Sequence, residues 1–128
     1  MSQENVEVVR RCFDDYLRGA PDEALAWLAP DVVWEVGQEL PARGPDAVRD
    51  LWERWESDWE GLEMAREEFI DAGDQVVVTV HYSGRGRGSG VPFDDRLFDV
   101  YTLREGKIIR KREFRDRSAA LDAAGVDE

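Results

Sequence analysis

The chain has 128 residues, of which 42% are apolar and 10% aromatic, and its formal net charge is −12. This length and composition predict one folded domain over residues 1–128 rather than a disordered chain. Because an acidic surface repels phosphate groups, the charge argues against nucleic acids and anionic membranes as partners.

The chain offers little for a disulfide or a metal site. Cys12 is the only cysteine, which excludes an intrachain disulfide, and a lone histidine, His81, does not make a zinc site. We see neither a secretion signal at the first residues nor an apolar run of the roughly 18 residues that a membrane span requires. We therefore expect a cytoplasmic protein with no metal and no cofactor.

Two helices are predicted at the start of the chain. Apolar residues recur at steps of three and four up to about Arg18, which is the spacing of one helix face. Phe13 and Tyr16 lie in this stripe. Pro21 then begins a short second helix that extends to Leu28.

A strand and a third helix follow. Alternation predicts a strand over residues 31–36, with Trp34 and Val36 on one face. The third helix carries Trp52 and Trp55 in its apolar stripe. Such a tryptophan stripe either packs in the core or a dimer interface, or lines a large ligand cavity, and the sequence leaves both open.

The second half of the chain is predicted to be mainly strands. Four strands are expected over residues 62–70, 75–83, 93–103 and 107–114, with a short helical tail over 118–124. The last two strands are joined by a tight turn at Gly106, because glycine adopts the positive φ that short hairpin loops require. The arginine–glycine run Gly84–Gly90 is predicted to be a hairpin loop. This order predicts an α+β fold with helices covering one face of a mainly antiparallel sheet.

Asp99 is the best candidate for a functional group. It shares a strand face with Leu97, Tyr101 and Leu103, so burial of that face would bury a carboxylate. A buried carboxylate must be paired or have a raised pKa. Asp99 is thus either catalytic, as a general base or a protonated hydrogen-bond donor, or structural, as the partner of an arginine. Arg112 is the first choice for that partner.

Five segments carry a resemblance to a known family: NVEVVRR in the opening helix, then ALAWLAPDVVW, GPDAV, FIDAGD and YTLREGKII. Together they resemble the nuclear transport factor 2-like superfamily, and within it the SnoaL-like branch that includes ketosteroid isomerases and polyketide cyclases. The resemblance implies a cone-shaped fold in which three N-terminal helices pack on a curved, mainly antiparallel sheet. It also implies an apolar pocket at the open end and a homodimer, which we expect to form through the exposed sheet face. This fold hosts both enzymes and non-enzymatic binders.

The resemblance to ketosteroid isomerase extends to only part of its site. The protonated oxyanion-hole aspartate of that enzyme falls on Asp99. Its general-base aspartate falls on Val36, or on Glu35 if the alignment shifts by one residue; the alternation with Trp34 favours Val36. Its oxyanion-hole tyrosine falls on Cys12, one turn before Tyr16. Two of the three catalytic groups are therefore missing or displaced, and steroid isomerase activity is not expected.

We predict a small-molecule pocket with Asp99 as its polar centre, suited to isomerase, cyclase or hydrolase chemistry on an apolar or polyketide-like ligand. The alternative is a non-catalytic binding or structural homodimer whose pocket is filled by its own aromatic side chains. The predicted ligand-binding residues are Phe13, Tyr16, Trp34, Val36, Trp52, Trp55, Tyr101, Arg112 and Phe114.

Overall fold

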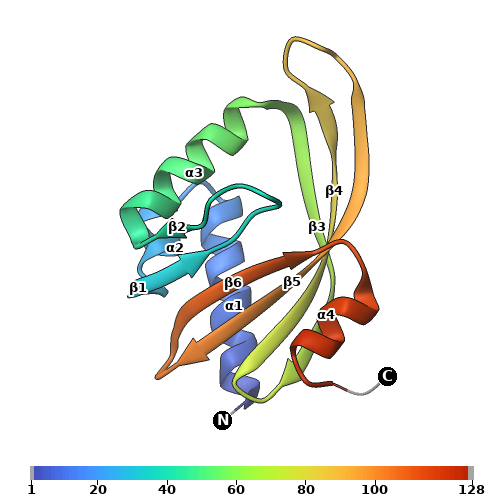
Figure 1. The fold of residues 1–128 in the computed structure, drawn as a ribbon. Helices are drawn as coiled ribbons and strands as arrows, with labels where there is room; N and C mark the ends of the chain where they lie inside the picture. The colour runs from blue at the N-terminus through green and yellow to red at the C-terminus, as the bar shows by residue number, and fades with distance from the viewer. Residues whose placement is uncertain (1, 127–128) are drawn as a thin grey trace.

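The computed structural model describes residues 2–126, which form one sheet with helices on both of its faces (Figure 1). The helices are α1 (Ser2–Leu17), α2 (Pro21–Leu25), α3 (Pro45–Ser57) and α4 (Arg117–Ala123). The strands are β1 (Leu28–Trp34), β2 (Ala42–Arg43), β3 (Trp59–Ala72), β4 (Gln75–Gly86), β5 (Pro92–Arg104) and β6 (Lys107–Phe114).

Prolines and glycines set several element boundaries. Pro21 and Pro45 each lie in the first turn of a helix, where a missing N–H costs no hydrogen bond. Gly44 precedes α3 with a φ of 86°, a conformation that favours glycine. Glu105 and Gly106 form the turn between β5 and β6 with φ angles of 51° and 77°. Two positive φ angles in a row are typical of a two-residue hairpin loop, which confirms the predicted turn.

The strands follow the order β2-β1-β6-β5-β4-β3 across the sheet. The β1–β6 pair is parallel, and the other neighbouring strands pair in antiparallel fashion. The pairing register shifts twice between β3 and β4 and once between β5 and β6. Such bulges bend and twist a strand, so the long strands curve and the sheet encloses space on one side.

The two faces of the sheet carry different layers. We call the face that packs against α1 and α3 the inner face; it holds the main core, which includes the fully buried Val9, Val48 and Val78. The opposite, outer face carries a smaller cluster that includes Val100 and Leu121 and is covered by α4. Figure 1 shows α4 on the other side of the sheet from α1 and α3. The α+β prediction is confirmed, except that the tail helix adds a layer on the second face.

The boundaries near β1 differ from the prediction. The second helix ends at Leu25, and β1 begins at Leu28 instead of residue 31. The carbonyl of Trp27 accepts a hydrogen bond of 2.9 Å from the amide of Ile108, so pairing with β6 begins there. This partner strand lies about 80 residues away in the chain, and local sequence patterns do not reveal such pairing.

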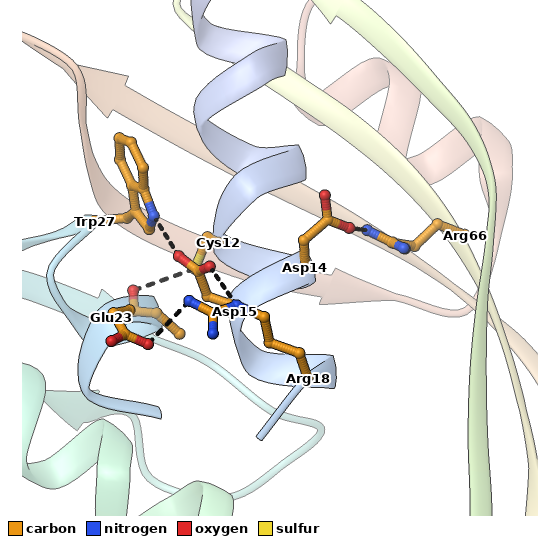
Figure 2. A network of polar contacts seen from close by, with 8 residues as sticks. Cys12, Asp14, Asp15, Arg18, Glu23, Trp27 and Arg66 are labelled. Atoms are coloured by element: carbon orange, nitrogen blue, oxygen red, sulfur yellow. Dashed lines mark hydrogen bonds and ion pairs between the residues drawn. The ribbon is translucent and has the colours of Figure 1, made fainter. Parts of the chain in front are cut away.

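Polar contacts along α1 hold this helix against its neighbours (Figure 2). Asp15 accepts hydrogen bonds from the indole of Trp27 at 3.0 Å and from Arg18 at 3.1 Å. Asp14 pairs with Arg66 of β3 on the other side of the helix. These contacts anchor the helix that supplies one wall of the cavity described next.

Candidate functional site

A cavity of about 70 Å³ lies between the inner face of the sheet and helices α1 and α3. Its lining is mostly apolar and aromatic, and Asp99 lies in its wall. The volume is below the roughly 300–1,000 Å³ of pockets that bury drug-sized ligands. In this conformation the cavity has room for a small molecule or a few waters.

Eight of the ten residues predicted for the site line this cavity. They are Phe13, Tyr16, Trp34, Val36, Trp52, Trp55, Asp99 and Tyr101. The aromatic rings also pack on one another: Trp34 meets Trp52 and Tyr101 edge-on, with centroid distances of 5.5 and 5.9 Å. The tryptophan stripe of α3 is therefore both core and cavity wall. A role for these residues in ligand binding stays a prediction.

The other two predicted residues, Arg112 and Phe114, do not reach the cavity. Phe114 packs in the outer cluster beneath α4. The guanidinium of Arg112 lies 5.6 Å from the centroid of the Phe114 ring and donates a hydrogen bond to the carbonyl of Ala123 at 3.3 Å. The prediction that Asp99 pairs with Arg112 is therefore wrong, because the two side chains lie on opposite faces of the sheet.

A β-bulge in β6 explains this error. Ile108 faces the inner core, so strict alternation would also turn Arg112 inward. The pairing with β5 shifts by one residue at Ile109, and the alternation reverses beyond it. As a result, Lys111 and Glu113 face the cavity in place of Arg112 and Phe114.

Asp99 is buried without a close hydrogen-bonding partner. Its side chain is 1% exposed, and within the described residues neither carboxylate oxygen accepts a hydrogen bond. The ammonium of Lys111 lies 3.7 Å from Oδ1. Burial raises the pKa of Asp99 to about 6; Lys111 and, to a smaller extent, Tyr101 oppose this increase, and the carboxylate of Glu113 adds to it. Asp99 therefore titrates near physiological pH.

Lys111 and Glu113 are site residues that the sequence analysis missed. Lys111 is only 4% exposed and donates to Glu113 Oε2 at 3.2 Å and to the carbonyl of Glu35 at 3.4 Å. Its ammonium also lies 5.3 Å from the centroid of the Trp34 ring. In the sequence this lysine is part of the basic run Arg110–Arg112, which resembles a solvated strand. The bulge that turns it inward has no clear signal in the sequence.

Three further groups in the wall keep their protons at neutral pH. Burial raises the pKa of Tyr82 and of Tyr101 well above the usual value, and the charge of Asp99 adds to both shifts. Burial likewise raises the pKa of the Cys12 thiol to about 12, and its Sγ donates to the carbonyl of Ala24 at 3.5 Å (Figure 2). The tyrosines are thus potential O–H donors, and the thiol is not a nucleophile.

The described residues show neither a metal cluster nor a membrane span. Within residues 2–126, no group of three or more His, Cys, Asp and Glu side chains is arranged to hold a metal ion. In the same range, no helix is long and apolar enough to cross a membrane. Asp99 and its neighbours remain the candidate site.

Comparison with known families agrees with this architecture. The SnoaL-like domain family matches residues 9–111, which is most of the chain. The chain belongs to the SnoaL-like family. No curated protein matches it.

Solved structures share the fold of this SnoaL-like chain over nearly its whole length. An NTF2-like protein from Burkholderia thailandensis is 26% identical, with a TM-score of 0.81, covering 96% of this chain and 98% of the other. A candidate SnoaL-like polyketide cyclase from Jannaschia sp. is 24% identical, with a TM-score of 0.80 and coverages of 98% and 94%. A protein with a ketosteroid isomerase-like fold from Catenulispora acidiphila, in complex with trimethylamine, is 18% identical, with a TM-score of 0.75 and coverages of 94% and 94%.

Proposed function

We propose that this SnoaL-like protein binds a small apolar ligand in the cavity and carries out proton-transfer chemistry on it, with Asp99 as the base. One observation carries the proposal: a 1%-exposed carboxylate in an aromatic wall has neither oxygen hydrogen-bonded by the described residues. A group that serves only structure normally has its hydrogen bonds satisfied. A pKa of about 6 also suits a base that works near neutral pH.

The neighbouring groups suggest how the reaction would proceed. Asp99 takes a proton from a carbon next to a carbonyl group, and negative charge develops on the carbonyl oxygen. Tyr82 and Tyr101 line the cavity and retain their protons, so their hydroxyls can stabilise that charge. Return of the proton at another carbon gives an isomerisation. Attack of the enolate on a second carbonyl instead closes a ring, and the proton held by Asp99 passes to the alkoxide that this attack forms. Activation of a water by Asp99 would instead give a hydrolysis.

The second candidate function is non-catalytic binding. The observation that favours it is the small cavity of about 70 Å³, enclosed by rings that pack against each other. In this alternative Asp99 accepts a hydrogen bond from the ligand and transfers no proton.

A ligand screen followed by turnover assays tests the proposal. Thermal unfolding is measured with steroids, polyketide-type aromatics, aromatic acids and trimethylamine. A ligand at 100 times its Kd stabilises the fold by about 2.7 kcal/mol. Any bound carbonyl compound is then assayed with the wild type, with Asp99→Asn, and with Asp94→Asn as a control on the same strand, where Asp94 instead pairs with His81.

We expect Asp99→Asn to lower kcat by about 100-fold or more, as loss of a general base does, and Asp94→Asn to have little effect. Binding without turnover would favour the non-catalytic function. Turnover that survives in Asp99→Asn would exclude Asp99 as the base.

We further propose that the protein forms a homodimer through the part of the outer face that α4 leaves uncovered. A cytoplasmic location stays a prediction from the sequence. Both rest on the sequence and on the family, and the dimer is tested below.

A further inference from the structure

Glu113 connects the base to a chain segment at the edge of the cavity. Glu113 Oε2 accepts a hydrogen bond from Lys111 at 3.2 Å, and Oε1 accepts one from the amide of Gly37 at 3.1 Å. Gly37 follows Val36, which lines the cavity, and is succeeded by an exposed loop in which Leu40 is 90% exposed. We call residues 35–37 the edge segment.

Lys111 binds the same segment and is held back from Asp99. Its ammonium lies 3.2 Å from Glu113 and 3.4 Å from the carbonyl of Glu35, but 3.7 Å from Asp99. The contact with Glu35 is made to the edge segment itself, and Glu113, which accepts the other, is also bound to Gly37 of that segment. Lys111 is the only lysine among the residues that line the cavity, and Asp99 is the most distant of its three oxygen contacts.

The charged and titratable groups around Asp99 come from four elements. Lys111 and Glu113 lie on β6, and Tyr101 lies on the same strand as Asp99. Tyr82 faces it from β4, and Cys12 and Tyr16 face the cavity from α1. Burial raises the pKa of each tyrosine and of the thiol, so these groups stay neutral while Asp99 titrates.

We propose that Glu113 is a positioning residue that couples closure of the edge segment to the proton affinity of Asp99. In the closed state, Glu113 and the carbonyl of Glu35 hold the Lys111 ammonium away from Asp99, and the carboxylate keeps a high proton affinity. When the segment opens, Lys111 loses its contact with Glu35 and moves toward Asp99, which stabilises the ionised carboxylate. The base is therefore strongest when the cavity is closed around its contents.

This inference rests on the proposed role of Asp99 as a base and adds a means of regulating it. Reciprocity follows from linkage: if closure raises the proton affinity of Asp99, protonation of Asp99 must favour closure by the same factor. Ionised Asp99 competes with Glu113 for Lys111, whereas neutral Asp99 does not. The proposal can thus be tested without a ligand in two ways, by the titration of Asp99 and by the opening of the edge segment.

The first test measures the titration of Asp99 by carbon NMR of its carboxyl group, assigned with Asp99→Asn. In Glu113→Gln the midpoint should fall by about one pH unit, since a like charge is removed and Lys111 is released toward Asp99. Glu35→Gln is the matched control: it removes one negative charge nearby, but its side chain pairs with Arg110 at 2.9 Å and its carbonyl stays in place. An unchanged or higher midpoint in Glu113→Gln, or an equal fall in the control, would overturn the proposal.

The second test uses the wild type, so it does not depend on the folding of a Glu113 variant. Hydrogen exchange of the Gly37 amide is followed from pH 5 to 7.5 and corrected for the intrinsic rate. Opening of the edge segment should become several-fold more frequent at pH 7.5, and this dependence should vanish in Asp99→Asn. The Gly44 amide donates a hydrogen bond to the carbonyl of Val32 at 2.9 Å, and its exchange rate serves as the reference for general opening near β1. The proposal fails if opening at Gly37 does not change with pH, or changes equally in Asp99→Asn.

These readouts separate the two proposals. Failure to find a ligand or turnover would count against Asp99 as a catalytic base, while the titration and the exchange rates would still report the coupling. The reverse result is also informative. If turnover requires Asp99 but the exchange rate of the Gly37 amide does not change with pH, the proposed function stands and the proposed role of Glu113 is excluded.

Discussion

At neutral pH, Asp99 carries a charge that its surroundings compensate only in part. An increase of its pKa from 3.8 to about 6 corresponds to roughly 3 kcal/mol that the ionised form costs the folded state. Its cross-strand neighbour Glu113 bears the same sign, which adds to the cost. A chain that retains such a group sacrifices stability at this position, as is common at functional sites.

This cost predicts how Asp99→Asn changes stability with pH. Because the folded-state pKa of Asp99 is raised, its protonation favours the folded state, and the wild type loses stability as the pH rises from about 4 through 6. At pH 8 the uncharged variant should be more stable than the wild type by about 1–3 kcal/mol. At pH 4 the two should be equal. Urea unfolding at both pH values measures the difference.

A large loss of stability in Asp99→Asn at pH 8 would contradict this account. That result would mean that the ionised carboxylate is mainly a structural partner of Lys111, because breaking a buried ion pair costs several kcal/mol. The difference in unfolding free energy between Asp99→Asn and the wild type at pH 8 thus separates the two interpretations: a more stable variant supports a functional Asp99, and a less stable variant supports a structural one.

At the scale of elements, an arginine joins the β4–β5 hairpin to the end of α3. The backbone amide of Arg87 donates to the carbonyl of Asp58 at 2.8 Å, and its guanidinium donates to the carbonyls of Ser57 and Trp59, each at 2.9 Å. The last carbonyls of a helix lack partners within the helix, so this side chain caps α3. The arginine–glycine run therefore has a structural use at its tip.

Arg87→Ala should loosen this connection. We expect a loss of about 1–3 kcal/mol, because the variant leaves the carbonyl of Ser57 at the end of α3 and that of Trp59 at the start of β3 without their charged donor. Amide exchange over residues 86–91 should accelerate, since Gly90 and Gly86 close the loop through a 2.9 Å hydrogen bond. Arg85→Ala is the control, as Arg85 makes one long contact of 3.4 Å to the same loop. Equal effects of the two substitutions would argue against capping by Arg87.

At the scale of the whole molecule, the outer face of the sheet is divided in two. The end near β6 is covered by α4, which packs on Val77 and Val100. Beyond this helix the face is polar and carries ion pairs, among them the two-contact pair of Arg96 with Glu67 at 2.6 and 3.1 Å. A dimer formed there would be held by charge complementarity as much as by apolar burial.

The oligomeric state provides the corresponding prediction. We expect sedimentation to give twice the chain mass of 14.7 kDa at micromolar concentration. Ser83→Arg adds bulk and charge to the outer face of β4 and should weaken the dimer at least about tenfold, whereas Gln38→Arg in an exposed loop should not. A monomeric wild type, or a dimer that Ser83→Arg leaves intact, would exclude this interface.

Much of the fold, and the position of Asp99 among aromatic side chains, could be predicted from the sequence alone. The turn at Gly106 is determined locally by the conformational freedom of glycine. The alternation along β5 then correctly placed Asp99 and Tyr101 together on a buried face. Likewise, helical spacing correctly placed Trp52 and Trp55 on one face of α3, and the structure shows that this face lines the cavity. These features depend on residues close to one another in the chain, so a local pattern suffices.

Only the tertiary structure decided which charges surround Asp99. The bulge at Ile109 reverses the faces of β6, so Lys111 and Glu113 turn inward while Arg112 turns outward. The parallel pairing of β1 with β6 brings the carbonyl of Glu35 to Lys111. Both arise from pairing between distant segments and from the curvature of the assembled sheet, and an alternating pattern cannot show where a strand gains one extra residue.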